Sequence, residues 1–197
     1  MAADSYHHGN LRAALLERAE AVLAESGITA LSLRGLARDL DVSHAAPTRH
    51  FRDRQALLDA LVISGFTDLN QRMQRAADVP GPVEARLAGL GRAYVGFATE
   101  RAALLGLMFS AKHEERAGER LRHLAHSSLE TAAALIGEAQ RAGVVRSGEP
   151  VRLAQVAFST VHGLAALAVG GLLDDTPLDE ATGLALEILL AGLRPAC

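Results

Sequence analysis

The clearest pattern of apolar and polar positions in the chain lies between residues 32 and 43. Four apolar residues recur at i, i+3, i+4 and i+7, the spacing of one buried helix face: Leu33, Leu36, Ala37 and Leu40. Ser32 stands just before them, and its hydroxyl can accept an unpaired backbone N–H of the first turn, so a helix is predicted to begin there. Asp41 occupies a turn position that needs a left-handed backbone, and Ser43 can cap a second short helix. Two helices joined by so tight a turn form a helix-turn-helix, which places its second helix in the DNA major groove.

The predicted second helix has an inner and an outer face. Pro47 and Phe51 are four residues apart and are expected to pack inward together with Val42. Four small or hydrogen-bonding residues point outward and are the expected groove-facing set: His44, Ala45, Thr48 and Arg49. Residues at helix N-termini or with positive charge are expected to contact phosphates: Ser32, Arg34, Ser43 and Arg54, with His50 as a further candidate. An ordinary solvated helical hairpin would show similar stripes, and the stripes alone leave this alternative open.

Further motifs surround this segment. A first helix ends near Gly27 in the run AESG, a short link leads to Ser32, the signature Thr48-Arg49-His50-Phe51 follows, and the next helix starts Arg54-Gln55-Ala56-Leu57-Leu58. With these features, the stretch from Tyr6 to about Leu61 resembles the DNA-binding domain of the tetracycline-repressor (TetR) family. Two positions depart from the family pattern: Thr48 replaces the usual Tyr, and Arg54 replaces the usual Lys. The resemblance implies a homodimer that binds double-stranded operator DNA overlapping a promoter and is released by a small effector.

The rest of the chain again has helical periodicity. Helices are expected at about residues 11–26, from Asp53 to about 77, and at 82–99, 100–112, 114–142, 150–173 and 179–193. Two prolines and a glycine in residues 78–82 cannot continue a helix, so this segment is a connector, and the domain boundary is placed earlier, near Gly65. The predicted fold is therefore all-α, with a helix-turn-helix DNA-binding domain at residues 1–64 and an effector-binding and dimerisation domain at residues 65–197.

The last predicted helix points to a partner chain. Between Thr182 and Leu193 only Glu187 is charged, so the helix is apolar on almost every face. A terminal helix of a small domain has one side toward its own core, so the other side is expected to meet a second copy. The preceding helix carries small residues that allow close approach, which favours a four-helix dimer interface. The residues expected in it are Ala157, Leu164, Leu184 and Ile188. A monomer that buries this helix completely is the alternative.

Composition narrows the class of protein. Of 197 residues, 49% are hydrophobic but only 4% aromatic, which favours a helical core of Leu, Ala and Val. Cys197 is the single cysteine, which excludes a disulfide framework, and the N-terminus lacks the order of a signal peptide, so a cytoplasmic location is expected. The longest apolar stretch, 161–173, is too short to span a bilayer, so no membrane partner is expected.

Charge is unevenly distributed along the chain. The net charge is −3, yet residues 34–54 contain five Arg against three Asp, while residues 100–197 contain nine basic and twelve acidic side chains. A basic edge on an otherwise acidic chain suits DNA contacts confined to one end.

Large apolar residues in the second half suggest an effector site. A pocket between helices is typically lined by such side chains with few polar groups, and the candidates are Tyr94, Phe97, Leu105, Met108, Phe109, Phe158 and His162. The run Phe158 to Gly163 resembles a Trp-x-x-Val-His-Gly pattern in one branch of the family, with Phe158 in place of Trp. Because no Arg or Lys is among these residues, the expected effector is small and mostly apolar. Plain core packing is an equal alternative.

Metal binding and enzymatic chemistry find little support. His123 and His126 could share a helix face, but no third ligand follows at a fixed spacing, so no metal site or cofactor is expected. Gly89-Leu90-Gly91 lies within a helix and does not form a phosphate loop. The protein is expected not to be an enzyme; an all-α ligand-binding protein or enzyme without a role in DNA binding is the alternative.

Overall fold

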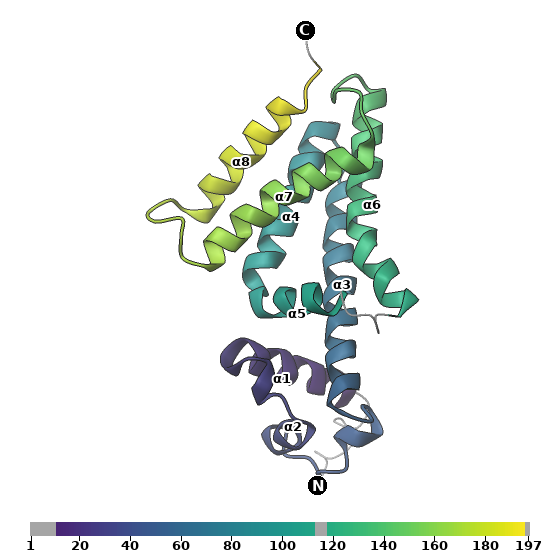
Figure 1. The fold of residues 1–197 in the computed structure, drawn as a ribbon, viewed down its shortest axis with the longest axis vertical. Coiled ribbons are helices and arrows are strands. Elements are labelled where there is room, and N and C mark those ends of the chain that lie inside the picture. Colours follow the sequence, from purple (N-terminus) through teal and green to yellow (C-terminus); the bar gives the residue numbers. More distant parts are fainter. Residues whose placement is uncertain (1–10, 113–117, 196–197) are drawn as a thin grey trace. The chain divides into compact units, whose positions relative to one another are not determined.

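The computed structural model describes residues 11–112 and 118–195, and all regular elements in these ranges are helical (Figure 1). They are α1 (Leu11–Ser26), the 3₁₀ helix η1 (Ile28–Ala30), α2 (Leu33–Asp39), the 3₁₀ helix η2 (Pro47–Arg49), α3 (Arg54–Asp78), α4 (Val83–Glu100), α5 (Ala102–Lys112), α6 (Glu119–Arg141), α7 (Pro150–Val169) and α8 (Leu178–Gly192). The all-α prediction is thereby confirmed. The chain divides into two compact units, residues 1–65 with 103–115 and residues 66–102 with 116–197.

The first unit combines the N-terminal helices with the start of α3 and most of α5. Leu15, Ala19 and Leu23 of α1 are buried, at the spacing of one helix face. A Cβ atom on Gly65 would lie 2.5 Å from Sδ of Met108, so a side chain here would have to displace Met108 where α5 packs on α3. Residues 103–112 of α5 lie in the same compact unit as the N-terminal helices, a grouping that sequence periodicity could not give. The division of the chain into functional domains stays a prediction.

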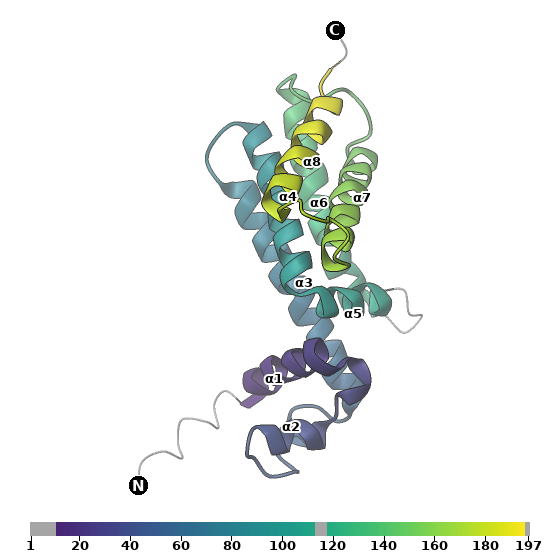
Figure 2. The same cartoon turned by 90° about the vertical axis from the view of Figure 1, so that its left-hand side faces the viewer.

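In the second unit, α7 packs against α4, α6 and α8 (Figure 2). Helix α8 turns Leu186 toward α4, where it lies so close to Gly91 that no Cβ would fit without a shift of Leu186. Helix α7 ends earlier than the predicted residue 173. Gly171 has φ +67°, and the N–H of Leu172 donates to the carbonyl of Leu167 at 2.9 Å, the Schellman arrangement that terminates a helix.

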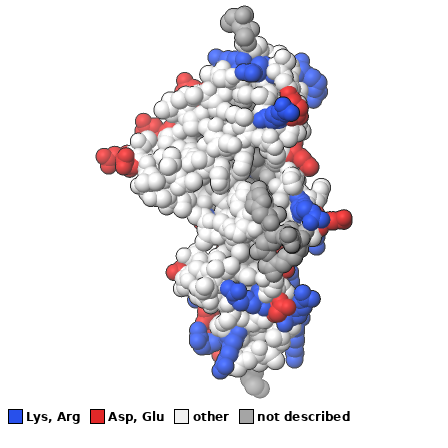
Figure 3. Space-filling model, viewed as in Figure 1, with Lys and Arg blue, Asp and Glu red and all other residues white. Residues whose placement is uncertain are grey.

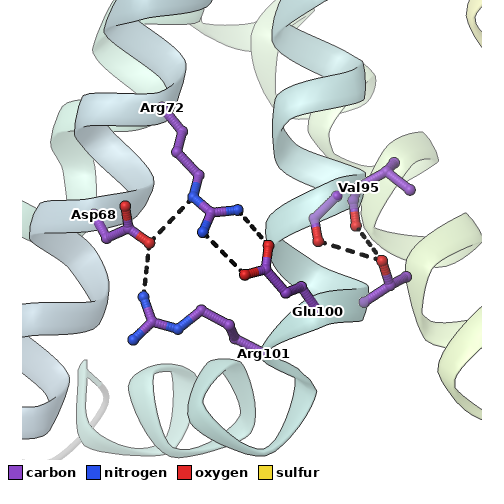
Figure 4. Close-up of polar contacts among 7 residues, drawn as sticks. Asp68, Arg72, Val95, Glu100 and Arg101 are labelled. Carbon is purple, nitrogen blue, oxygen red and sulfur yellow. Dashed lines mark hydrogen bonds and ion pairs between the residues drawn. The ribbon is translucent and has the colours of Figure 1, made fainter. Parts of the chain in front are cut away.

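An ion-pair network fixes the second half of α3 against the end of α4 (Figure 4). Oδ2 of Asp68 accepts from Nε of Arg72 at 3.1 Å and from Nη1 of Arg101 at 2.6 Å. Both nitrogens Nη1 and Nη2 of Arg72 donate to the carboxylate of Glu100, at 2.6 and 3.3 Å. These hydrogen bonds lower the pKa of Glu100 below its ordinary value. The guanidinium groups of Arg72 and Arg101 also lie over the ring of the buried Phe97, 5.4 and 5.5 Å from its centre, and form cation–π interactions with it.

Helix α7 also meets the length and composition of a membrane span. Residues Pro150–Val169 have a mean hydropathy of 1.3 over an 18-residue window, so the expectation that no apolar stretch is long enough was wrong for this helix. Core helices of soluble proteins pass the same test, which makes a single such helix weak evidence for a membrane.

Candidate DNA-binding interface

The predicted helix-turn-helix begins as the sequence indicates. Ser32 has an extended backbone, and its Oγ accepts a hydrogen bond from the N–H of Gly35 at 3.0 Å, which caps α2. Asp41 has φ +51°, as the turn prediction requires, and the N–H of Val42 donates to the carbonyl of Ala37 at 2.9 Å. The cap at Ser32 and the left-handed turn at Asp41 are therefore confirmed.

The segment after the turn, residues 43–50, is called the reading segment below. It was predicted as a short α-helix, but it consists of a turn followed by η2. The N–H of Ala46 donates to the carbonyl of Ser43 at 2.9 Å, an i to i−3 bond. Pro47 has no N–H, so it cannot make the i to i−4 bond to Ser43 that an α-helix needs here. The chain therefore takes the tighter 3₁₀ pattern.

The inner side of the reading segment is held by two buried residues. Pro47 and Phe51 are buried, as predicted, and Val42 is half-buried. The guanidinium group of Arg12 on α1 lies over the ring of Phe51, 5.3 Å from its centre. The reading segment and the chain that leaves it are therefore held against other parts of the first unit, with Phe51 packed under Arg12 of α1.

All nine residues predicted to touch DNA are exposed: Ser32, Arg34, Ser43, His44, Ala45, Thr48, Arg49, His50 and Arg54. Two of them have intramolecular partners that the sequence did not predict. Oγ1 of Thr48 donates to the carbonyl of Ala45 at 2.8 Å, and the guanidinium group of Arg54 donates to backbone carbonyls of Ile28 and Leu31. The roles of all nine in DNA binding stay predictions.

Arginine side chains gather over α1 and α2, with carboxylates between them (Figure 3). Nε of Arg18 on α1 donates to Oδ2 of Asp39 on α2 at 3.0 Å, and Arg38 contacts the other oxygen at 3.3 Å. The hydrogen bond from Arg18 lowers the pKa of the Asp39 carboxyl below its ordinary value. Asp39 therefore stays ionised near neutral pH, and its charge offsets part of the positive charge near the interface.

The structure brings three of the predicted effector residues together in the second unit. The hydroxyl of Tyr94 on α4 and Nδ1 of His162 on α7 form a hydrogen bond of 2.8 Å. The ring of Phe158 stacks on His162 with centres 5.4 Å apart and meets the edge of Tyr94 at 5.2 Å. Tyr94 is buried, which raises its pKa well above the ordinary value, whereas Phe158 and His162 are half-buried.

The other predicted effector residues have different surroundings. Phe97 is fully buried under Arg72 and Arg101. Leu105 and Met108 are buried and Phe109 is half-buried, and all three belong to the first unit. These four residues support core packing at least as well as a ligand site.

Two of the predicted dimer residues form an exposed apolar surface on α8. Leu184 is 57% exposed and Ile188 is 64% exposed, while Ala157 and Leu164 on α7 are half-buried. Val156 and Leu167 extend the exposed apolar surface on α7. In the view of Figure 3, the area over α7 and α8 is largely free of charged side chains.

Sequence patterns did not single out Asn70 on α3. Its Nδ2 donates to the carbonyl of Leu124 on α6 at 2.9 Å, and its buried Oδ1 has no partner among the described residues. A polar residue at a buried position of the helical pattern would have been the only signal in the sequence.

The described residues contain no group of three or more His, Cys, Asp or Glu placed to hold a metal ion. Nδ1 of His126 is instead 2.7 Å from the carbonyl oxygen of Arg122. His113, the N-terminal residues to Asn10 and Cys197 lie outside the described residues.

The helix-turn-helix and the helical second unit agree with the comparisons to known proteins. Residues 15–61 match the family described as "Bacterial regulatory proteins, tetR family", and residues 87–192 match "Tetracyclin repressor-like, C-terminal domain". The chain therefore belongs to the TetR family of transcriptional regulators, which bind DNA through a helix-turn-helix.

Solved structures place the chain in the same fold. A protein of unknown function from Rhodococcus sp. RHA1 is 46% identical, with a TM-score of 0.89 and coverage of 97% of this chain and 99% of that one. The TetR family regulator PfmR of Thermus thermophilus is 21% identical, with a TM-score of 0.73 and coverage of 91% and 98%. The ketosteroid transcriptional regulator KstR2 of Mycobacterium tuberculosis is 18% identical, with a TM-score of 0.72 and coverage of 93% and 95%. The search of curated proteins finds no match.

Proposed function

We propose that this regulator is a cytoplasmic repressor that binds operator DNA as a homodimer and is released by a small, mostly apolar effector. The observation that carries the proposal is the pair of exposed surfaces with opposite chemistry. One is the exposed, arginine-rich surface around the reading segment, and the other is the apolar surface of α7 and α8.

The apolar surface supports the homodimer. Leu184 and Ile188 point away from the side of α8 that carries the buried Leu186, so the helix has a second apolar face with no cover in a single chain. Burial of a Leu or Ile side chain contributes about 1.5–3 kcal/mol, and a two-fold axis would place both residues of each protomer in one interface. A dimer also presents two reading segments, one for each half of a palindromic operator.

The exposed residues of the first unit support a division of roles on DNA. Arg34 and the serines at positions 32 and 43 are proposed to contact phosphates, which gives affinity and salt dependence. His44, Ala45, Thr48 and Arg49 are proposed to face base edges, which gives sequence preference, and His50 is proposed to reach a phosphate.

The cluster of Tyr94, Phe158 and His162 supports an effector site. Two half-buried rings beside a buried phenol offer an apolar surface with a polar tip, a combination suited to a mostly apolar ligand with few polar groups. Effector binding is proposed to favour a dimer whose reading segments no longer match the spacing of the two half-sites.

The proposal is tested with DNA first. Duplexes enriched by the purified protein from a random pool are expected to share a palindromic sequence, and a promoter fused to that sequence is expected to be less active when the protein is present. Binding to all duplexes alike would contradict operator recognition. Increased promoter activity would replace repression with activation.

A further inference from the structure

Arg54, the first residue of α3, makes hydrogen bonds to a segment that lies far from it in the sequence. Its Nε donates to the carbonyl of Leu31 at 2.9 Å, and its Nη2 donates to the carbonyl of Ile28. Both carbonyls belong to the link between α1 and α2. One side chain therefore ties the start of α3 to this link.

The local charges explain why the guanidinium group turns toward these carbonyls. A cation at the N-terminus of a helix is unfavourably placed, because the positive end of the helix dipole lies there. The carbonyl oxygens of Ile28 and Leu31 carry the opposite partial charge, and that of Ile28 also accepts from the N–H of Leu31 at 3.3 Å. The two hydrogen bonds therefore place the cation of Arg54 against partial negative charge.

The link between α1 and α2 leads directly into the cap of α2, within the candidate DNA-binding interface. Leu31 is buried, and the next residue, Ser32, is the cap of α2. The buried residues Leu36 and Ala37 of α2, with the bond from Val42 to Ala37, then determine where the reading segment begins. A shift of the link would therefore move α2 and, through α2, the reading segment.

We propose that Arg54 is a positioning residue for operator recognition, which holds the link and α2 in the orientation that the reading segment needs. This inference rests on the proposed operator binding. It differs from the expectation that Arg54 acts as a phosphate contact.

Arginine suits this role better than lysine. The planar guanidinium group carries five N–H donors in a fixed fork, so it can reach two carbonyls together, whereas an ammonium group lacks this geometry. Neither partner of the two hydrogen bonds is a carboxylate, so the positive charge of Arg54 is not neutralised by them. Arg54→Lys therefore keeps the charge that a phosphate would attract and removes the fork.

The experiment compares Arg54→Lys with the matched control Arg52→Lys. Arg52 is also an exposed arginine near the start of α3, and its Nε contacts the adjacent Asp53 at 3.1 Å. Affinities are measured from about 50 to 200 mM salt for two probes, a duplex enriched by the wild-type protein from a random pool and a scrambled duplex of the same length.

We expect Arg54→Lys to lower the affinity for the enriched duplex about tenfold, the effect of losing one charged hydrogen bond. The slope of log affinity against log salt and the affinity for the scrambled duplex are expected to stay unchanged. Arg52→Lys is expected to behave as the wild type.

Amide hydrogen exchange of the DNA-free protein provides a second measurement. Exchange of residues 28–36 is expected to rise in Arg54→Lys and not in Arg52→Lys, and this result does not depend on operator recognition. Wild-type affinity together with wild-type exchange in Arg54→Lys would overturn the proposal. Faster exchange with unchanged operator affinity would also overturn it, because Arg54 would then stabilise the link without guiding recognition. If the wild type does not distinguish the two duplexes, the proposed operator binding fails, while the exchange result still tests whether Arg54 holds the link.

Discussion

The hydroxyl of Tyr94 and Nδ1 of His162 are joined by a hydrogen bond of 2.8 Å that links α4 to α7. The two residues are 68 positions apart in the sequence. Tyr94 is almost fully buried, so its hydroxyl needs this partner: an unsatisfied buried hydroxyl costs about 1–3 kcal/mol. The bond thus satisfies a polar group inside the helical core and orients the ring of His162 at the same time.

Tyr94→Phe should change the dependence of stability on pH. Burial raises the pKa of Tyr94, so the folded chain keeps the phenol neutral where the unfolded chain, with an ordinary pKa of about 10, ionises. The stabilising contribution is therefore complete below about pH 10 and is lost as the pH rises further. We expect the variant to be less stable by about 1 kcal/mol at about pH 8 and to lose less stability than the wild type between about pH 8 and 11. Urea unfolding at both pH values measures this, and equal losses in the two proteins would contradict it.

Arg34→Ala should weaken binding to all DNA sequences alike. A phosphate contact carries no sequence information, and its loss reduces the slope of log affinity against log salt by about one. Arg75→Ala is the matched control, because Arg75 is an exposed arginine near the end of α3, outside the first unit. Fluorescence anisotropy with several duplexes from about 50 to 200 mM salt measures both variants. A change of sequence preference in Arg34→Ala with an unchanged slope would reverse the proposed roles.

His44→Ala should instead alter the preference among operators. His44 is exposed in the turn before η2 and is proposed to face base edges. The loss of one base contact typically changes discrimination at the contacted position by about 1–3 kcal/mol. Sequencing of duplexes enriched by the wild type and by the variant measures this. The same enriched sequence for both proteins would remove His44 from the groove-facing set.

Ile188→Glu should give a folded monomer. Ile188 is 64% exposed in a single chain, so the protomer itself can tolerate a charge there, whereas a charge buried in an apolar interface has no partner. Val79→Glu is the matched control, because Val79 is also an exposed apolar residue, at 55%, on the link after α3. Sedimentation at micromolar concentration should show dimers for the wild type and the control, with helical circular dichroism for all three proteins. A wild-type monomer, or a dimer of Ile188→Glu, would contradict the proposed interface.

Phe158→Ala should change ligand selectivity more than folding. Phe158 is half-buried and stacks on His162, so its removal widens the proposed effector site. A thermal-shift screen with uncharged apolar compounds and, separately, phosphorylated compounds is expected to give stabilising hits for the wild type in the first group only. The variant is expected to respond to a different subset of that group while its operator affinity without compound is unchanged. Equal losses of stability and DNA binding with an unchanged set of hits would favour core packing.

Local patterns predicted most of the helices. The bounds of α1 were predicted to the residue, and those of α3 and α4 within a few residues, because apolar spacing, caps and prolines are local signals. The reading segment was predicted with the wrong helix type. Its apolar spacing fits either form, and the missing N–H of Pro47 decides between them.

The candidate site was predicted in part. The exposure of His44, Ala45, Thr48 and Arg49 agrees with the predicted outward face, and the left-handed Asp41 agrees with the predicted turn. The partners of Arg54 could not be predicted, because the carbonyls it contacts are 23 and 26 residues away. For the same reason the sequence could not distinguish Phe97, buried under two guanidinium groups, from Phe158, which stays partly accessible beside His162.

The sequence by itself determined the all-α fold, the cap at Ser32, the turn at Asp41 and the family, since each depends on residues within one or two helical turns or on a short motif. Only the tertiary structure decided which apolar faces are covered. Leu186 reaches α4 because Gly91 leaves room for it, while Leu184 and Ile188 on the same helix stay exposed. The physical reason is that periodicity identifies an apolar face, whereas the element that covers it depends on the packing of segments distant in the sequence.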